Sequence, residues 1–237
     1  MAMRSTGRNA KKAKLSSAAP TVLSRNIMKP AEDSKLYRLI RLPNEMRCLL
    51  ISDPTLAEVS KAHEDEDEEL EGEEEEGEEE EGEEEEGEEE EEGTKKAACA
   101  LCVGVGSFSD PMGLDGLAHF TEHMVFMGTE KFPTENEWSS WLAEKGGEDN
   151  GETHLETTTC YFDVQPEHLR PCLERFASFY ACPLFNFDSA DREVKAIESE
   201  FQQAKTEDEN RLYQLLCHLI GTGDPSHPYG RFSWGNA

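Results

Sequence analysis

Residues 114–128 read LDGLAHFTEHMVFMG. The apolar residues in this stretch recur at helical spacing, and a glycine directly after the last of them is a common helix stop. We therefore expect a largely buried helix that ends before Gly128. Three polar side chains interrupt its apolar residues: His119, Glu122 and His123. Because an unpaired polar group inside a core is unfavourable, these three side chains need a partner.

The spacing of these polar residues, HxxEH, suits a metal ion. His119 and His123 are four residues apart, so both imidazoles leave one face of a helix, as chelation of a single Zn²⁺ requires. Glu122 can act as a general base on a water at the metal without binding the metal itself. The pattern is the inverse of HExxH and is typical of inverzincins. In the alternative, the two histidines are capped or solvated residues, and the polar groups find other partners.

A catalytic zinc needs a third protein ligand, and the segment DREVKAIESEF at 191–201 offers three glutamates. Its apolar positions define a core-facing helical stripe: Val194, Ile197, Phe201 and Ala204. At about 100° per residue, Glu193 and Glu200 lie together at the edge of this stripe. Glu198 lies about 160° away from Glu200. We predict Glu200 as the third ligand, Glu193 as a residue that supports a ligand, and Glu198 as solvated.

Outside the motif helix, the sequence predicts alternating strands and helices. Strands at 36–42 and 47–52 are joined by a tight turn at Pro43-Asn44, and the apolar run AACALCV at 97–103 predicts a buried strand. The next elements are a helix at 135–145, one or two strands within 150–165, a helix at 166–180, and a long helix capped by Asp188 or Ser189 and running towards Ile220. This order predicts an α/β (α+β) domain whose mixed sheet carries helices on one face.

The formal net charge of −29 is concentrated in one segment. Residues 64–93 contain 24 of the 52 acidic residues and no base, which leaves 28 acidic and 23 basic residues elsewhere. Such a run cannot be buried, so we expect a disordered acidic insert. The balance argues against nucleic acid as a partner, because a phosphate-backbone binder needs clustered Lys and Arg. The longest uncharged stretch, 97–109, is shorter than the roughly 18 to 20 residues that span a membrane.

The N-terminal segment 1–30 contains seven basic residues and no acidic one. It fits a disordered tail, which we expect over 1–35, or a nuclear-localisation patch around KKAK, or an organelle transit segment. The seven cysteines are odd in number and have no framework spacing, so they indicate free thiols in a reducing compartment. We expect a cytoplasmic location, with mitochondrial and nuclear locations as alternatives. Cys99 and Cys102 would face opposite sides of a strand and so could not share a metal.

Three stretches together resemble the pitrilysin and insulin-degrading-enzyme family of zinc metallopeptidases. They are HFTEHMVFMGTEKFPTENEW at 119–138, GGEDNGETHLETTTCYFDV at 146–164 and DREVKAIESEF at 191–201. The acidic insert and the segment HPYGRFSWGNA at 227–237 are similar to the nardilysin branch of that family, which cleaves at dibasic sites. The resemblance covers about residues 36–237, and it implies a catalytic domain there, interrupted by the insert at 64–93.

The resemblance implies a role for each matching residue. It implies Zn²⁺ as the cofactor, bound by the two motif histidines and Glu200, with Glu122 as the catalytic base and Glu193 as the supporting carboxylate. Asn150 matches the family's edge-strand asparagine, which holds the backbone of a substrate. Gly151 stands where the family usually has alanine.

Family members are several times longer and consist of four related domains. The resemblance therefore implies an N-terminal fragment whose remaining family domains are absent from this chain. It implies peptide substrates, mainly basic ones. Two alternatives keep the fold without the chemistry: a catalytically silent homologue, and an acidic protein-interaction module in which the insert binds basic proteins.

Overall fold

The computed structural model describes residues 18–25, 27–54, 95–221, 224, 226–230 and 234–235. The chain divides into two compact units, residues 1–88 and 89–237. The acidic insert at 64–93 and residues 1–17 of the expected tail lie outside the described residues, so disorder there stays a prediction. Within the described part, no helix is both long and apolar enough to cross a membrane.

The first unit contains a three-stranded antiparallel sheet in the order β1-β2-β3. The expected hairpin is confirmed as β2 (Leu36–Arg41) and β3 (Arg47–Ser52). Strand β1 (Thr21–Ser24) pairs with β2, although it lies within the segment 1–35 that was expected to be a disordered tail. Four residues are too few to show an alternating pattern, and β1 is defined by its pairing with β2 rather than by its own sequence.

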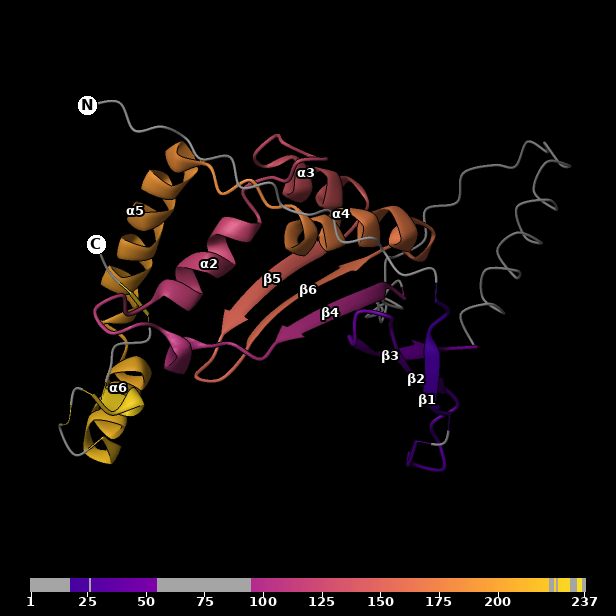
Figure 1. Ribbon diagram of the computed structural model, residues 1–237, viewed down its shortest axis with the longest axis horizontal. Helices are drawn as coiled ribbons and strands as arrows, with labels where there is room; N and C mark the ends of the chain where they lie inside the picture. Colours follow the sequence, from indigo (N-terminus) through magenta and orange to yellow (C-terminus); the bar gives the residue numbers. More distant parts are fainter. Residues whose placement is uncertain are drawn as a thin grey trace, which may run out of the picture. The chain divides into compact units, whose positions relative to one another are not determined.

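The second unit contains another three-stranded sheet in the order β4-β6-β5. Its strands are β4 (Ala97–Val103), β5 (Glu148–Thr153) and β6 (Thr158–Val164). In this unit the helices α2, α3 and α4 lie along the sheet (Figure 1). The α/β (α+β) class is therefore confirmed.

The pairing within the sheets differs from the prediction, because all described strand pairs are antiparallel and belong to two sheets rather than one mixed sheet. The connections explain this. The β2–β3 and β5–β6 links are short hairpins, which force antiparallel pairing, whereas a parallel pair needs a long crossover. Strand β4 is half-buried rather than fully buried, with alternate residues exposed, as is typical of a strand in an antiparallel sheet that is covered on one face.

The core of the second unit lies between β6 and the helices α3 (Glu137–Glu144) and α4 (Leu169–Ala181). The inward-facing residues of β6 are alternate positions that are almost fully buried: Cys160, Phe162 and Val164. Trp138 of α3 meets Phe162 edge to face, with ring centroids 5.8 Å apart. Helix α2 (Leu117–Val125) contributes Val125 to this core, so its C-terminal end is held by packing.

The expected helices at 114–127, 135–145 and 166–180 are confirmed as α2, α3 and α4, each with a later start than predicted. The prediction of one long helix towards Ile220 is wrong. The chain forms α5 (Phe187–Ala204) and α6 (Asp208–Ile220) instead. Thr206 and Asp208 have low helix propensity, and the Thr206 hydroxyl donates to the Gln203 carbonyl oxygen at the break.

The N-cap of α5 was also predicted wrongly. Asn186, rather than Asp188 or Ser189, caps the helix, because its side-chain oxygen accepts a hydrogen bond from the Asp188 backbone N–H (3.1 Å). Asn186 has the extended backbone conformation of an N-cap. Asp188 lies in the first turn, where its negative charge interacts favourably with the positive end of the helix dipole.

Candidate metal centre

Helix α2 lies between strand β5 and helix α5, and a remote carboxylate fixes its start. The buried Asp110 accepts hydrogen bonds from the backbone N–H groups of Gly116 (2.8 Å) and Ala118 (2.9 Å). It thereby caps the helix, which Gly116 cannot do because it has no side chain. A negative charge at this end also suits the helix dipole. Asp110 was not predicted, since it lies outside the usual capping spacing.

The two motif histidines face each other on α2. Their Nε2 atoms are 3.2 Å apart, and their rings meet at 87° with centroids 4.8 Å apart. A tetrahedral zinc with nitrogen ligands at 2.0–2.1 Å separates the two nitrogens by about 3.3 Å. The spacing of His119 and His123 is therefore that of a chelating pair.

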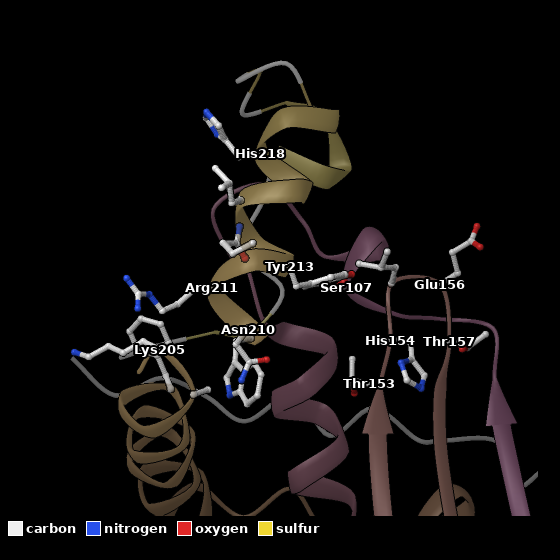
Figure 2. A pocket seen from close by; sticks show the side chains of 16 residues that line it. Ser107, Thr153, His154, Glu156, Thr157, Lys205, Asn210, Arg211, Tyr213 and His218 are labelled. Carbon is white, nitrogen blue, oxygen red and sulfur yellow. The ribbon is translucent and has the colours of Figure 1, made fainter. Parts of the chain in front are cut away.

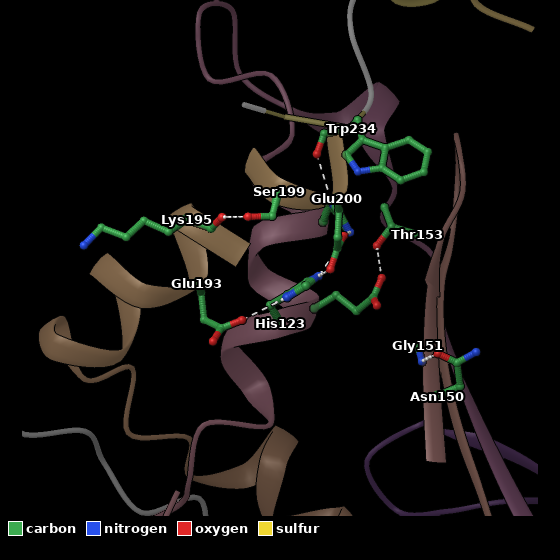
Figure 3. Close-up of polar contacts among 11 residues, drawn as sticks. His123, Asn150, Gly151, Thr153, Glu193, Lys195, Ser199, Glu200 and Trp234 are labelled. Atoms are coloured by element: carbon green, nitrogen blue, oxygen red, sulfur yellow. Dashed lines mark hydrogen bonds and ion pairs between the residues drawn. The ribbon is translucent and has the colours of Figure 1, made fainter. Parts of the chain in front are cut away.

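The other nitrogen of each histidine has an acceptor of its own. His123 Nδ1 lies 2.9 Å from Glu193 Oε2, and His119 Nδ1 lies 2.7 Å from the backbone oxygen of Trp234. A carboxylate and a backbone carbonyl oxygen only accept hydrogen bonds, so each Nδ1 is the donor, and in the tautomer with Nδ1–H the Nε2 lone pair is left for a metal. Figure 3 shows Glu193 and Trp234 on opposite sides of His123.

Glu200 of α5 completes the cluster. Its Oε2 lies 3.6 Å from His119 Nε2, and its Oε1 lies 3.6 Å from His123 Nε2. Two lone pairs and a carboxylate that converge in this way repel one another unless a cation lies between them. The donor set and its spacing therefore fit a zinc ion. Within the described residues, His119, His123 and Glu200 form a group of possible ligand side chains whose ligand atoms all lie within 4.8 Å of one another.

The position of Glu198 supports the helical-wheel argument. Its carboxylate lies away from the cluster and accepts a hydrogen bond from the Gln202 side chain. It is half-buried rather than fully solvated. The predicted core stripe is only partly present, because Ile197 and Ala204 are buried whereas Val194 is 39% exposed.

Glu122 points from α2 towards strand β5 rather than into the ligand set. It is buried, and the Thr153 hydroxyl donates a hydrogen bond to its Oε2. It also lies against Gly151, where an added methyl group would come within 2.3 Å of Glu122 Oε1. Thr153 was not predicted. The available signal was strand alternation, which places Thr153 on the same face as Gly151.

Asn150 lies on β5, which is an end strand of the described sheet, as the resemblance implied. Its side chain is on the exposed face and does not point at the histidines (Figure 3). Asn150 Oδ1 accepts from the Gly151 N–H (2.9 Å), and Asn150 Nδ2 donates to the Tyr161 hydroxyl (3.3 Å). The structure thus places Asn150 and Gly151 beside the centre, on the strand that Glu122 faces.

A cavity of about 910 Å³ adjoins this centre. Thr153 and Trp234, which contact Glu122 and His119, are among its lining residues. The remaining lining comes from Ser107, the β5–β6 turn, the end of α5 and helix α6 (Figure 2). Its size is within the range of ligand-binding pockets.

Comparison with known proteins agrees with this geometry. Residues 88–221 match the sequence model described as insulinase, peptidase family M16. The chain belongs to the insulinase family. This confirms the resemblance found in the sequence, and the match includes the whole of α2, β5, α5 and α6.

Several insulinase-family proteins are similar to this chain. A nardilysin-like protein of Arabidopsis thaliana is 45% identical over 239 aligned positions, which cover 91% of this chain and 23% of that protein. Insulin-degrading enzyme of Homo sapiens is 39% identical over 223 positions, 94% of this chain and 18% of the enzyme. Nardilysin of Homo sapiens is 50% identical over 143 positions, 60% of this chain and 12% of that protein.

A crystal structure of pitrilysin has the same fold, with a TM-score of 0.71 and 30% identity. The comparison covers 92% of this chain and 19% of the pitrilysin chain. The chain therefore spans about a fifth of the length of the relatives it matches.

Proposed function

We propose that this chain binds Zn²⁺ through His119, His123 and Glu200 and contributes the catalytic centre of a metalloendopeptidase. The observation that carries the proposal is the convergence of the two histidine Nε2 atoms and one carboxylate at tetrahedral spacing. The Glu200 side chain is 42% exposed, so the centre is open to water and substrate on that side, as a catalytic site requires.

Glu122 is proposed as the general base. When bound, Zn²⁺ supplies Lewis acidity, which acidifies a water and polarises the scissile carbonyl. The Glu122 carboxylate accepts the proton of the attacking water and later passes it to the leaving amine. The Thr153 hydroxyl holds this carboxylate in place, while Glu193 holds the ring of His123. These contacts leave Glu122 free of the ligand set, as its role requires.

Substrate is proposed to bind in an extended conformation along the outer edge of β5. This is an end strand of the described sheet, and main-chain hydrogen bonds to such an edge give affinity without depending on sequence. The Gly151 N–H is directed to the Asn150 side-chain oxygen, so a substrate carbonyl would replace that contact and release Asn150 to hold the substrate backbone. Gly151 lies against Glu122, and Asn150 precedes it on the same strand, which fits hydrolysis of a bond held at this edge.

We propose that preference for basic, dibasic substrates arises outside the cavity next to the centre. Two basic residues, Lys205 and Arg211, line that cavity, and Glu156 is the single carboxylate in its lining. This charge balance does not suit a pair of basic substrate side chains. The acidic insert at 64–93 is the stronger candidate, because a run of 24 acidic residues attracts cationic peptides over distances set by the ionic strength. Deleting 64–93 should then remove the salt dependence of cleavage and leave zinc binding unchanged.

The test of the function uses the 237-residue chain, zinc analysis and a dibasic peptide. We expect about one zinc per chain and cleavage that a chelator abolishes. Glu122→Gln should keep the zinc and lower the rate at least about 100-fold, within the range for general-base catalysis. Glu198→Gln is the matched control, since Glu198 lies away from the cluster. An unchanged rate in Glu122→Gln would exclude Glu122 as the base.

The same measurements, together with the deletion of 64–93, separate the alternative functions. A catalytically silent homologue would bind zinc and leave the peptide intact, whereas an acidic interaction module would lose its basic partners when 64–93 is deleted. The intact set of His119, Glu122, His123 and Glu200 favours the enzyme. A cytoplasmic location remains our proposal from the cysteine pattern, to be checked by imaging the tagged chain.

A further inference from the structure

A segment distant in sequence lies directly on the metal-binding helix. Trp234 follows His119 by 115 residues, yet its backbone oxygen is 2.7 Å from His119 Nδ1. The Trp234 indole also meets the His119 ring edge to face, with centroids 6.0 Å apart. Among the described residues, Glu193, Glu200 and Trp234 make four polar contacts with the two imidazoles. Only the contact from Trp234 involves a main-chain atom.

The segment is seated by the close approach of two glycines. A Cβ on Gly116 would be 2.3 Å from Gly235 Cα and 3.1 Å from the carbonyl carbon of Trp234. Gly116 and Gly235 both have left-handed backbones, with φ of +88° and +84°. Only a residue without a side chain at 116 lets the two backbones approach so closely. The position of the Trp234 carbonyl therefore depends directly on Gly116.

This dependence bears on the protonation of His119. A neutral imidazole carries its hydrogen on either nitrogen, and the hydrogen bond made by one nitrogen decides which is free to bind a metal. For His123 a carboxylate, Glu193, makes that choice. For His119 the choice is made by the main chain of Trp234, which is in close backbone contact with Gly116.

We propose that the Trp234–Gly235 segment is a positioning element of the metal centre. Seated on Gly116, it holds the hydrogen of His119 on Nδ1 and aims Nε2 at the zinc. The proposal rests on the zinc site described above. Because linkage is reciprocal, zinc binding in turn stabilises the seated segment. The contact is a main-chain one, so replacing the Trp234 side chain should matter less than displacing its backbone.

The test compares two glycines of similar conformation. Gly116→Ala places a methyl group against Gly235 and the Trp234 carbonyl carbon. Gly113→Ala is the matched control, because Gly113 has φ +80° and its added Cβ would meet no atom within 4 Å. Trp234→Phe keeps the carbonyl and an aromatic ring. Each variant is measured by competition with a chromophoric zinc chelator and, without metal, by ¹⁵N NMR of histidine-labelled chain, which reports the tautomer of His119.

We expect Gly116→Ala to weaken zinc binding about 10- to 100-fold, the range found when a hydrogen-bond partner of a metal-binding histidine is lost. Without metal, its spectrum should show His119 exchanging between the Nδ1–H and Nε2–H tautomers. The unaltered chain should show the Nδ1–H tautomer alone. Gly113→Ala and Trp234→Phe should stay close to the unaltered chain in both measurements. Circular dichroism is the control for folding. If it is unchanged in Gly116→Ala, an altered tautomer of His119 cannot be attributed to loss of helix structure.

Unchanged zinc affinity and an unchanged tautomer in Gly116→Ala would overturn the proposal, as would equal effects of Gly113→Ala. If Gly116→Ala does not fold, a chain that ends at Ser233 replaces it, because it lacks the carbonyl but keeps Gly116. If the unaltered chain binds no zinc, the proposed function fails, and the tautomer of metal-free His119 still decides whether Trp234 positions it.

Discussion

Gly151 lies directly beneath the carboxylate of Glu122, so closely that a Cβ at 151 would be 2.3 Å from Glu122 Oε1. Thr153, two residues further along the same face of β5, donates to Glu122 Oε2. The strand thus shapes the position of the proposed base from two sides: a missing side chain gives it room, and a hydroxyl holds it. Each of these contacts can be removed separately.

Thr153→Val should lower the rate of peptide cleavage about 10- to 100-fold without changing zinc affinity. Valine keeps the shape of threonine and removes the hydrogen bond to Glu122, and small displacements of a reacting group reduce rates on this scale. Steady-state kinetics with the zinc-loaded chain measures it. Thr159→Val is the control, since strand alternation places Thr159 on the other face of the sheet. Equal losses in both variants would contradict the assignment.

Gly151→Ala should make the effect of Thr153→Val smaller. The added methyl group pushes the flexible end of Glu122 away from β5, so the hydrogen bond from Thr153 is already lost. The two substitutions should therefore be non-additive in a double-mutant cycle of cleavage rates, as expected for residues that share one partner. Full additivity would show that Gly151 and Thr153 act on Glu122 independently.

The convergence of His119, His123 and Glu200 could be predicted because it follows from local helix geometry. Spacing of four residues on one helix determines that His119 and His123 face together, and the angle per residue determines which glutamates of the second helix share a face. A local argument also holds for the hairpin of β2 and β3, whose turn residues lie between its strands in the sequence. Packing of those elements only reinforces a pattern that the sequence already contains.

The features that were missed depend on contacts distant in sequence. Asp110 caps α2 across a turn, Thr153 reaches Glu122 from a neighbouring strand, and the Trp234 carbonyl reaches His119 from 115 residues away. A backbone carbonyl has no residue type, so no composition or spacing indicates it. The break between α5 and α6 was missed for a different reason, because apolar periodicity continues on both sides of Thr206.

Glu193→Gln should weaken zinc binding about 10- to 100-fold. The amide can still accept a hydrogen bond from His123 Nδ1, but it removes the negative charge 2.9 Å away that makes the imidazole a better ligand. Competition with a chelator measures the affinity, and Glu198→Gln provides the control on the same helix. If the two variants bind zinc equally well, Glu193 does not support the site.

Asp149→Asn should raise the thermal stability of the chain at pH 7. Burial raises the pKa of Asp149, and the neighbouring Trp138 indole lowers it by less. A folded-state pKa above the unfolded one means that stability is fully present below the unfolded pKa of 3.8 and is lost as pH rises through the folded pKa. The gain in melting temperature should therefore disappear when both proteins are compared below pH 3.8. A gain that is independent of pH would indicate altered packing instead.

Cys172 should resist alkylation in the folded chain, whereas Cys102 should react. Burial raises the pKa of the Cys172 thiol to about 12, so at pH 8 only ~10⁻⁴ of it is the reactive thiolate. Cys102 is exposed on β4. Iodoacetamide treatment and peptide mass mapping measure both sites, with a urea-unfolded sample in which both should react at similar rates. Modification of Cys172 as fast as Cys102 in the folded chain would mean that α4 opens from the sheet, because the thiol cannot be reached while that helix stays packed.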